Sequence, residues 1–588
     1  EIESFVKDDK VYIDEDYEQF LSSLSEYNII EKNSVLIDEM RNENHNIRLF
    51  CVKNLKSISE LLGVKRTEEE LLPMMIEILM GKEDNQDILI EMGNMLFELS
   101  KGLVTMRGLE ILAGNDDEAV RINATERLCD LISTFDENSV NLDIFPLMKR
   151  LIDNDMKSKI SCCHLFPVVY PRLVNVILKN QLLQAFFEIS KEDAPSVRRA
   201  VAYNIRKFTD QSLYTGSTED ANKVIKEILP LQVNMLKDSV DIVKAVAIDS
   251  SGILVKSLDQ EDRIKLMKQL IEILEGERSW RVRHAGASTI CCFCENFDQE
   301  FIEEHVMKIV ISLLKDTEPE VKVAILSHIE LIVKKLSFNF LESKILPIFN
   351  ENIINDSNHH VRSIFLTKLF LIAKYLNINE YSLHFFPMVK KMVKEDSYEV
   401  KVSSMLHIEE LSKYFTIEDP QSETFLTSVS EILTILSKDI KWRVRLNLAE
   451  KMKDFLKKLP TMIFIKQFWG IICSFYVDNA FQIREEALNC ILEICNRDNS
   501  GVIFKDFLVE KVLPLISEHS GSSNYIFRIC AIQTIEKLLA NTDVLNGMFS
   551  ITDKSEGLEK KLFSMLMKMG NDKIANVRFC LANSIKKA

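Results

Sequence analysis

The sequence has 588 residues, of which 46% are hydrophobic and 28% charged, and its formal net charge is −16. A chain of this length exceeds the roughly 250–300 residues at which a single hydrophobic core stops growing, so we expect several domains or a stack of repeats. The negative charge argues against non-specific nucleic-acid binding, which requires clustered Lys and Arg. Protein partners are therefore the default expectation.

Turn-forming residues are scarce in this chain. It contains 16 Gly and 12 Pro, far below the usual shares of about 7% and 5%. Chains rich in β-hairpins or βαβ units need these residues at their turns. The composition therefore favours helices throughout.

The first residues of the chain, 1–33, lie outside the periodic pattern that follows. We predict that residues 1–33 form an N-terminal extension that is partly helical. Residues 34–588 are predicted to form a continuous array of repeats.

A short motif in which an apolar residue precedes a basic one recurs along this array. The string WRVR occurs at residues 280–283 and again at 442–445. From Arg283 to Arg484 the intervals between basic residues are 39, 40, 39, 44 and 39. A fixed period repeated many times is the signature of a repeat architecture. Fourteen units are marked by Arg48, a degenerate copy at Leu89, Arg121, Lys159, Arg198, Lys244, Arg283, Lys322, Arg362, Lys401, Arg445, Arg484, Arg528 and Arg578.

A proline after two apolar residues provides a second marker, thirteen to sixteen positions before the basic one. It occurs at Pro73, Pro146, Pro230, Pro347, Pro387 and Pro514. Proline is tolerated in the first turn of a helix, so we expect it to mark the start of the first helix in each unit. The apolar–basic motif then marks the second helix.

The unit around Lys322 illustrates the predicted hairpin. Apolar residues at helical spacing fall into two groups: Val306, Ile309, Val310, Leu313 and Leu314, then Val321, Ala324, Ile325, Ile329 and Ile332. His328 falls on the apolar side of the second group, where we expect a core histidine. The polar segment between the two groups predicts a short turn.

An acidic residue recurs in these turns, five or six positions before the basic one. The examples are Asp116, Asp193, Asp238, Asp316, Asp356, Asp396, Asp439, Asp478 and Asp572. Asp is a favourable N-cap, and the recurrent Asp and Arg could form a ladder between neighbouring units. Two helices per period of about forty residues predict an all-α HEAT-repeat solenoid.

The sequence offers little support for an enzyme or a metal site. It has no phosphate-binding glycine loop, no His-Glu-x-x-His and no nucleophile elbow. Cys291, Cys292 and Cys294 include one Cys-x-x-Cys pair without the second pair of a zinc site, and His359 and His360 lack a third ligand. We therefore interpret the twelve Cys as free thiols in a reducing compartment, and we predict no catalytic residue, metal or cofactor.

Several longer strings together resemble the scaffold (A) subunit of protein phosphatase 2A. They include VLIDEMRNENHNIRL, LGVKRTEEELLP, FPLMKRL, SWRVR, KWRVRL and ANVRF, in order from Ser34 to the end of the chain. The resemblance implies a horseshoe-shaped superhelix of helical hairpins, of which the family has fifteen. The chain ends inside the fourteenth unit, so the family's last repeat is expected to be absent from these residues.

The resemblance also implies two sets of binding residues at the turns within the repeats. For an exchangeable regulatory (B-type) subunit the residues are Asp193, Pro195, Arg198, Arg199, Trp280 and Arg281. For the catalytic subunit they are Trp442, Arg443, Phe481, Asn524, Tyr525 and Asn576. The family has Trp where this chain has Met156, and Thr where it has Ala194. A loop inserted near residues 541–557 is expected because Arg528 and Arg578 are 50 positions apart.

The implied function is a non-catalytic, monomeric scaffold within a heterotrimeric phosphatase, without nucleic-acid or membrane partners. We expect a cytoplasmic location, with the nucleus as the second compartment. The alternatives that remain open are a HEAT-repeat nuclear transport receptor, which is also an acidic solenoid, another protein-interaction solenoid, and an enzyme with an unrecognised site. From the residues alone, Trp280 and Trp442 either contact partners, as is typical of interface Trp, or pack on a neighbouring repeat.

Overall fold

A computed structural model describes residues 15–24, 27–81, 83–99, 103–210, 218–394, 397–415, 420–497, 506–540 and 555–587. These ranges contain helices and the turns between them, and no strand. None of the helices in these ranges has the length and apolar character needed to cross a membrane. The all-α prediction is confirmed.

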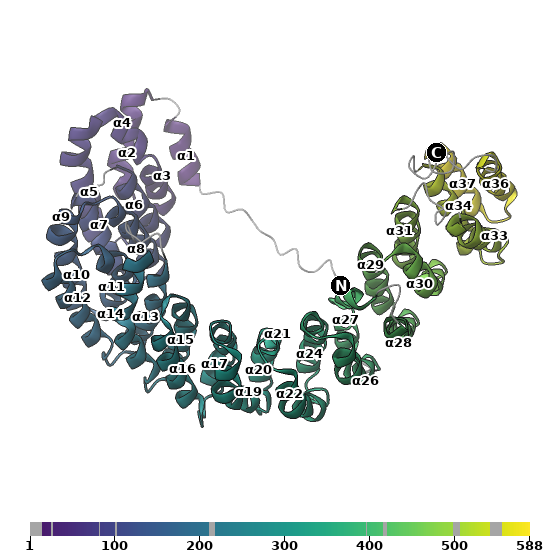
Figure 1. The fold of residues 1–588 in the computed structure, drawn as a ribbon. Helices are drawn as coiled ribbons and strands as arrows, with labels where there is room; N and C mark the ends of the chain where they lie inside the picture. The colour runs from purple at the N-terminus through teal and green to yellow at the C-terminus, as the bar shows by residue number, and fades with distance from the viewer. Residues whose placement is uncertain are drawn as a thin grey trace. The chain divides into compact units, whose positions relative to one another are not determined.

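The chain divides into two compact halves, Glu1–Asn296 and Phe297–Ala588. Within each half, helices follow one another in chain order, as Figure 1 shows. Within each half, the second helices pack on the second helices of the neighbouring units, and most also pack on the first helix of their own unit. This is the packing of an α-solenoid, in which each hairpin contacts mainly its neighbours.

The first half contains seven hairpins in its described residues. Their first helices are α2 (Ile29–Asp38), α5 (Leu72–Met80), α7 (Leu103–Ala113), α10 (Phe145–Asp153), α12 (Val176–Ile189), α14 (Thr218–Leu236) and α16 (Gln260–Leu274). The second helices are α3 (His45–Lys53) with α4 (Leu55–Arg66), α6 (Gln86–Leu99), α8 (Glu118–Ser133), α11 (Met156–Val169), α13 (Pro195–Ile205), α15 (Asp241–Leu254) and α17 (Trp280–Cys294). Short helical turns precede or extend several of these, such as α9 (Glu137–Ser139).

The second half likewise shows seven hairpins among its described residues. Their first helices are α19 (Met307–Leu314), α23 (Leu346–Ile348), α26 (Phe386–Val393), α28 (Pro420–Ser437), α30 (Thr461–Tyr476), α33 (Leu513–Ser520) and α36 (Ser555–Lys568), and α18 (Gln299–Phe301), α22 (Phe338–Phe340) and α25 (Ile378–Glu380) precede the first three. The second helices are α20 (Pro319–Leu326) with α21 (Ile329–Val333), α24 (His359–Ile372), α27 (Tyr398–Ser403), α29 (Trp442–Lys458), α31 (Phe481–Arg497), α34 (Tyr525–Ala540) and α37 (Ala575–Lys587).

Two helices begin within residues 1–33. Helix α1 (Glu15–Leu24) lies inside residues 1–33, as expected for a partly helical segment. Helix α2, however, begins at Ile29, where Asn28 and Glu31 form a capping box, so the predicted boundary at residue 33 falls within the first hairpin. Most of the predicted inserted loop, residues 541–554, lies outside the described residues.

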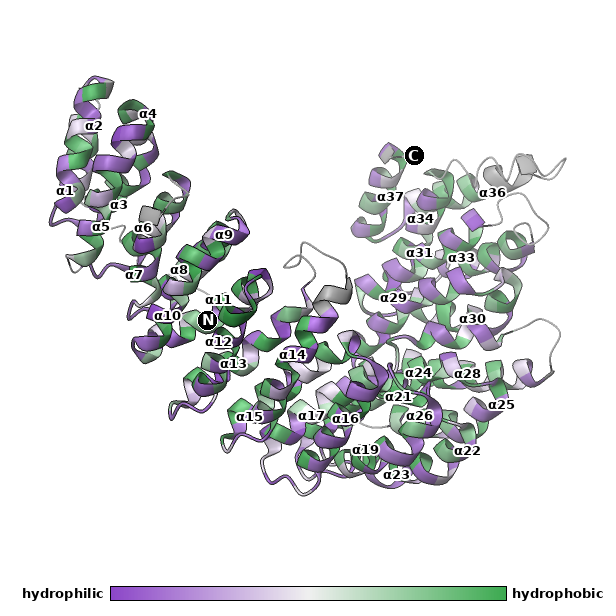
Figure 2. Cartoon of the chain, turned by 60° about the vertical axis from the view of Figure 1, so that its left-hand side comes forward, coloured by the Kyte–Doolittle hydropathy of each residue, from purple (hydrophilic) through white to green (hydrophobic). Residues whose placement is uncertain are grey.

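The hydrophobic core follows the predicted apolar stripes. All ten apolar residues predicted in the unit around Lys322 are buried, none of them more than 7% exposed. Figure 2 shows apolar and polar residues on the same helices, as amphipathic packing requires. The cores therefore lie inside and between hairpins.

The recurrent proline lies at the second residue of the first α-helix in five units, as predicted, and inside α14 at Pro230. In these five units a π-helical turn leads into the α-helix. Asp136 caps a helix that starts at Glu137, nine residues before Pro146, and its backbone widens to a π-helical turn at Val140–Ile144. Similar π-helical turns end two residues before Pro73, Pro347, Pro387 and Pro514. Proline lacks an N–H and crowds the preceding turn, and a π-helical turn accommodates it within a continuing helix.

The prediction that His328 lies in the core is wrong, because its side chain is exposed. The second helix of its unit breaks between Leu326 and Ile329, and His328 has φ −132° and ψ 15°. The Ser327 hydroxyl donates to the carbonyl of Val323 at 2.7 Å, a local bond that competes with regular helix geometry. The break turns His328 away from the apolar stripe.

The basic residue of the motif closes the turn of its own hairpin. In Arg198, Nη1 donates to the carbonyl oxygens of Glu192 at 2.6 Å and Asp193 at 3.0 Å. The same pair of bonds, to residues six and five positions earlier, recurs at Arg48, Arg121, Arg283, Arg362, Arg445, Arg484 and Arg528. These bonds satisfy backbone carbonyls of the turn between the two helices.

The same basic residues form the expected ladder by pairing with an acid of the following unit. The pairs are Arg48–Glu83, Lys159–Glu192, Arg198–Asp238, Lys244–Glu277, Lys322–Asp356, Lys401–Asp439, Arg445–Asp478 and Arg528–Asp572. Every ladder acid lies six positions before the marker residue of its own unit, which is basic in every case except Leu89. Asp116 and Asp193, which were also predicted, lie five positions before Arg121 and Arg198 and are exposed. Asp396 lies outside the described residues.

Seven of the eight ladder carboxylates also accept a hydrogen bond from a backbone N–H two residues later in their own turn. Asp478 accepts from Arg445 Nε at 2.6 Å and from the backbone N–H of Ala480 at 2.9 Å. Burial alone would raise the pKa of Asp478, but these hydrogen bonds and the Arg445 charge together lower it. The hydrogen bond from Arg528 is the main reason that the pKa of Asp572 is lowered.

We predict that Arg198→Ala lowers the free energy of unfolding by about 3 kcal/mol, because it leaves a nearly buried carboxylate, Asp238, without its cation. Arg198→Lys should recover part of this loss, since Lys occupies the same register in native units. The control is Arg150→Ala, which breaks a pair whose Arg side chain is 54% exposed and should cost less than about 1 kcal/mol. Urea titration, followed by the helical circular dichroism signal, measures the free energy of unfolding of all three variants. Equal losses of stability in Arg198→Ala and Arg150→Ala would contradict the role of the ladder.

Acid should also weaken the ladder. Its carboxyl groups at Asp238, Glu277, Asp439, Asp478 and Asp572 all have lowered pKa values in the fold. Groups of this kind add stability above their unfolded pKa of about 4, and this stability is lost as the pH falls through their folded pKa. We expect the free energy of unfolding to fall steeply below about pH 4, and Asp478→Asn should reduce that slope. An unchanged slope in Asp478→Asn would refute this assignment.

Candidate protein-binding surfaces

Both Trp residues of the repeated WRVR string occupy the first position of a second helix. Trp280 begins α17 and Trp442 begins α29. Their side chains are 39% and 42% exposed. Arg281 and Arg443 lie over the indole rings, at 5.1 and 5.5 Å from the ring centroids. Each Trp therefore presents a partly covered aromatic surface with a cation beside it.

The second half repeats this arrangement in consecutive units. Phe481 and Tyr525 begin α31 and α34 and are 51% and 39% exposed. Asn524, next to Tyr525, accepts from the backbone N–H of Ile526 at 3.0 Å and so caps the helix. Asn576 is exposed at the second position of α37. The predicted catalytic-subunit residues thus lie at the starts of four consecutive second helices.

Two apolar turn residues were missed in the sequence. Ile440 is 98% exposed and Ile574 is 40% exposed, each at the turn that precedes a second helix. The signal that could have revealed them is an isolated apolar residue inside an otherwise polar turn. Ile440 lies two residues before Trp442, so both belong to the same turn.

The predicted regulatory-subunit residues all lie in the first half, and they divide into two kinds. Asp193, Pro195 and Arg199 are exposed around the start of α13. Arg198 is directed inward instead: its side chain is 11% exposed and pairs with Asp238. Arg198 therefore serves the ladder, and the exposed neighbours form the accessible surface.

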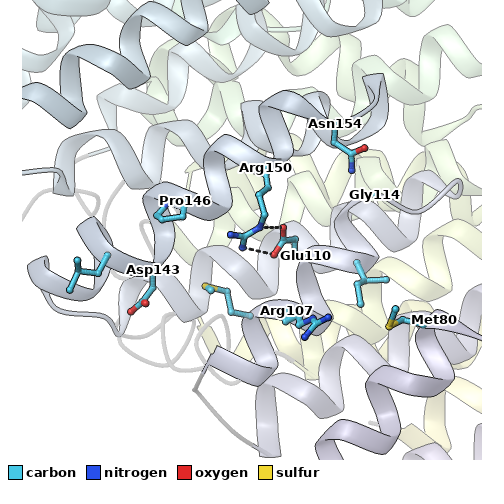
Figure 3. A pocket seen from close by; sticks show the side chains of 11 residues that line it. Met80, Arg107, Glu110, Gly114, Asp143, Pro146, Arg150 and Asn154 are labelled. Carbon is cyan, nitrogen blue, oxygen red and sulfur yellow. Dashed lines mark hydrogen bonds and ion pairs between the residues drawn. The ribbon is translucent and has the colours of Figure 1, made fainter.

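A groove on the first helices of the first half has a volume of about 790 Å³. Figure 3 shows its lining from α5, α7 and α10, with Arg150 and Glu110 facing each other across it. Arg150 donates to both carboxylate oxygens of Glu110, at 2.7 and 2.8 Å. The opposite charges neutralise each other, and Arg107 beside them is exposed.

The described residues hold no cluster of three or more His, Cys, Asp or Glu that could bind a metal ion. No disulfide joins any of the twelve Cys, all of which lie in the described residues. Burial raises the pKa of Cys495 to about 12 and that of Cys473 to about 11. A thiol acts as a nucleophile only when deprotonated, so these two are poorly suited to catalysis at neutral pH.

Comparison with curated proteins finds relatives among the scaffold subunits of protein phosphatase 2A. The chain is 35% identical over 204 residues to the protein phosphatase 2A scaffold subunit of Dictyostelium discoideum, covering 34% of this chain and 33% of the relative. It is 26% identical over 290 residues to the regulatory (A) subunit of protein phosphatase PP2A from Saccharomyces cerevisiae, covering 46% of this chain and 45% of the relative. The alpha isoform of the 65 kDa regulatory (A) subunit from Arabidopsis thaliana is 32% identical over 204 residues, covering 33% of each chain.

These alignments confirm the resemblance to this family, although they span only a third to a half of each relative. No protein-family model matches the chain. All three relatives are named as scaffold or regulatory subunits and none as a catalytic subunit.

Solved structures with the same fold include importin beta and Kap121p. Importin beta superposes with a TM-score of 0.59 at 11% identity, covering 99% of this chain and 81% of that one. Kap121p superposes with a TM-score of 0.58 at 14% identity, covering 95% of this chain and 57% of Kap121p. At this identity the likeness concerns the fold alone, and it confirms the HEAT-repeat α-solenoid.

Proposed function

We propose that this chain is the non-catalytic scaffold subunit of a protein phosphatase 2A-type holoenzyme. The observation that carries the proposal is the row of exposed apolar side chains at the turns of consecutive units in the second half. The row contains Ile440, Trp442, Phe481, Tyr525 and Ile574. The sequence relatives, all named as scaffold or regulatory subunits, support the same reading.

Folding of the chain alone leaves much of this apolar surface in water. Ile440, at 98% exposure, gains almost nothing from the hydrophobic effect, and burying such a side chain contributes about 1.5–3 kcal/mol. Trp, Tyr and Arg are also the residue types that dominate interface energies. A protein surface covering this row would recover that energy, and we assign it to the catalytic subunit.

The regulatory subunit is assigned to the first half. There Asp193, Pro195, Arg199, Trp280 and Arg281 are exposed at turns. Each proposed partner thus contacts residues of one compact half. A chain built in this way joins two proteins without supplying any catalytic group itself.

The alternative of a nuclear transport receptor is supported by the fold likeness to importin beta and Kap121p. Their identity to this chain is 11–14%, against 26–35% for the scaffold relatives. Sequence similarity over defined segments therefore favours the scaffold function.

Co-purification separates these functions. We expect the tagged full chain to recover a phosphatase catalytic subunit together with a B-type regulatory subunit, identified by mass spectrometry, and to lack phosphoserine-peptide hydrolysis when purified alone. Recovery of a small GTPase without a phosphatase would favour the transport receptor. Hydrolysis by material from which mass spectrometry excludes a catalytic subunit would refute the non-catalytic assignment.

A substitution pair tests the assignment of the two surfaces. Trp442→Ala should weaken catalytic-subunit binding by about thirty-fold to several hundred-fold, because truncating a central interface Trp costs about 2–4 kcal/mol. Ile440→Asp should also weaken it without changing the melting temperature, since Ile440 is almost fully exposed. Trp280→Ala is the matched control, which should spare binding of the catalytic subunit but weaken that of the regulatory one.

Binding titrations beside thermal melts give the comparison. If Trp442→Ala lowers the melting temperature while the affinity for the catalytic subunit stays within twofold, Trp442 packs between repeats and does not form the interface. Unchanged binding in Ile440→Asp would point to the same conclusion.

A further inference from the structure

The ladder of the first half is interrupted at Arg121. Its Nη1 closes the turn in the usual way, donating to the carbonyls of Asn115 and Asp116, both at 2.8 Å. In the complete rungs, Nε and Nη2 bind a carboxylate of the next unit, as Arg198 binds Asp238 at 2.7 and 3.0 Å. Among the described residues, no ion pair joins Arg121 to any carboxylate.

The following turn explains this interruption. Asp153 occupies the register of the ladder acid, but α10 ends at this residue, and Asn154 after it is extended, with ψ −160°. Asp153 is exposed as a result. Asp155 is used to cap α11, accepting from the backbone N–H of Ser158 at 2.9 Å. Neither acid forms an ion pair with Arg121, although the Arg121 charge contributes to lowering the pKa of Asp155. The rung that a ladder acid would complete is therefore incomplete at Arg121.

Arg121 lines a groove formed by the second helices α8, α11 and α13, with a volume of about 630 Å³. Arg199 lines the same groove and is exposed. Three apolar side chains beside them are also exposed: Ile122 at 44%, Met156 at 46% and Tyr203 at 39%. The groove thus combines two guanidinium groups with apolar surface.

The charge of the groove is positive. Lys157 pairs with Asp116, so Arg121 and Arg199 are opposed only by Glu118 among the charged lining residues. His164, which also lines the groove, is neutral at physiological pH because burial lowers its pKa to about 4. A local excess of positive charge in a chain of net charge −16 favours an acidic partner.

We propose that this groove receives an acidic residue next to an apolar one, on an extended segment of the regulatory subunit. Its carboxylate binds Nε and Nη2 of Arg121, in the place that the ladder acid takes elsewhere, and contacts Arg199. Its apolar neighbour packs against Ile122 and Met156. The inference rests on the proposed function and deepens it, because Arg199 belongs both to this groove and to the predicted regulatory surface.

The ladder itself supplies the expected geometry. A guanidinium group binds a carboxylate through two parallel hydrogen bonds, and the Arg198, Arg445 and Arg528 rungs all use Nε and Nη2 in this way. Lys replaces Arg at several rungs, so one charged contact suffices there. The partner's acid is therefore expected to tolerate Lys at position 121 but not a neutral residue.

The first experiment titrates the full chain with the B-type regulatory subunit recovered by co-purification. Arg121→Gln should weaken binding at least about tenfold, whereas Arg121→Lys should remain within about threefold of the unmodified chain. The control is Arg484→Gln, which removes the same two turn-closing bonds in the second half and should leave regulatory-subunit binding unchanged. The difference between Arg121→Gln and the unmodified chain should shrink at high salt, because screening weakens charge pairs.

A second substitution avoids the turn altogether. Arg199→Glu places a negative charge in the groove at an exposed side chain, and it should weaken binding at least about tenfold without lowering the melting temperature. Its control is Arg107→Glu on the first helix α7, outside this groove. If Arg121→Gln is too unstable to titrate, Arg199→Glu decides the result.

An affinity of Arg199→Glu for the regulatory subunit within twofold of the unmodified chain would overturn the inference. Equal losses for Arg199→Glu and Arg107→Glu would also overturn it, since they would show a general effect of charge. If the unmodified chain binds the catalytic subunit but no regulatory subunit, the proposed function of the first half fails and this inference falls with it. That outcome appears before any variant is compared, so the two failures are distinguishable.

Discussion

The stacking of these hairpins depends on one basic side chain in the first turn of the second helix, which is present in every unit except that of Leu89. In Arg198, Nη1 closes the turn of its own hairpin while Nε and Nη2 bind Asp238 of the next unit. Arg can do both at once because its guanidinium is a planar fork with five donors, whereas Lys presents a single ammonium. The ladder therefore joins the geometry of each turn to the position of its neighbour.

A turn held in this way determines which residues face outward. The residue three positions before the basic one begins the second helix, and at this position lie Trp280, Trp442, Phe481 and Tyr525. All four are 39–51% exposed. The ladder thus stabilises the stack from inside the turn and leaves a regular row of positions at which large side chains can meet another protein.

The fold and the sequence relatives contribute different parts of the functional argument. A HEAT-repeat solenoid is shared with importin beta and Kap121p at 11–14% identity, so architecture alone does not separate a phosphatase scaffold from a transport receptor. The separation comes from particular side chains at the turns and from identities of 26–35% to scaffold subunits. Substitutions at exposed turn residues therefore distinguish the two functions better than substitutions in the core.

The sequence by itself determined the repeat period, the two helices per unit and the buried apolar stripes, because local spacing encodes helix faces directly. It also located the turns that carry Trp280 and Trp442. Only the tertiary structure showed that Pro146 lies inside a longer helix, that Arg198 points inward, that Ile440 is exposed, and that Arg121 lacks its acid. These features depend on how one hairpin meets the next, and residues some forty positions apart are brought together by packing that no local pattern in the sequence specifies.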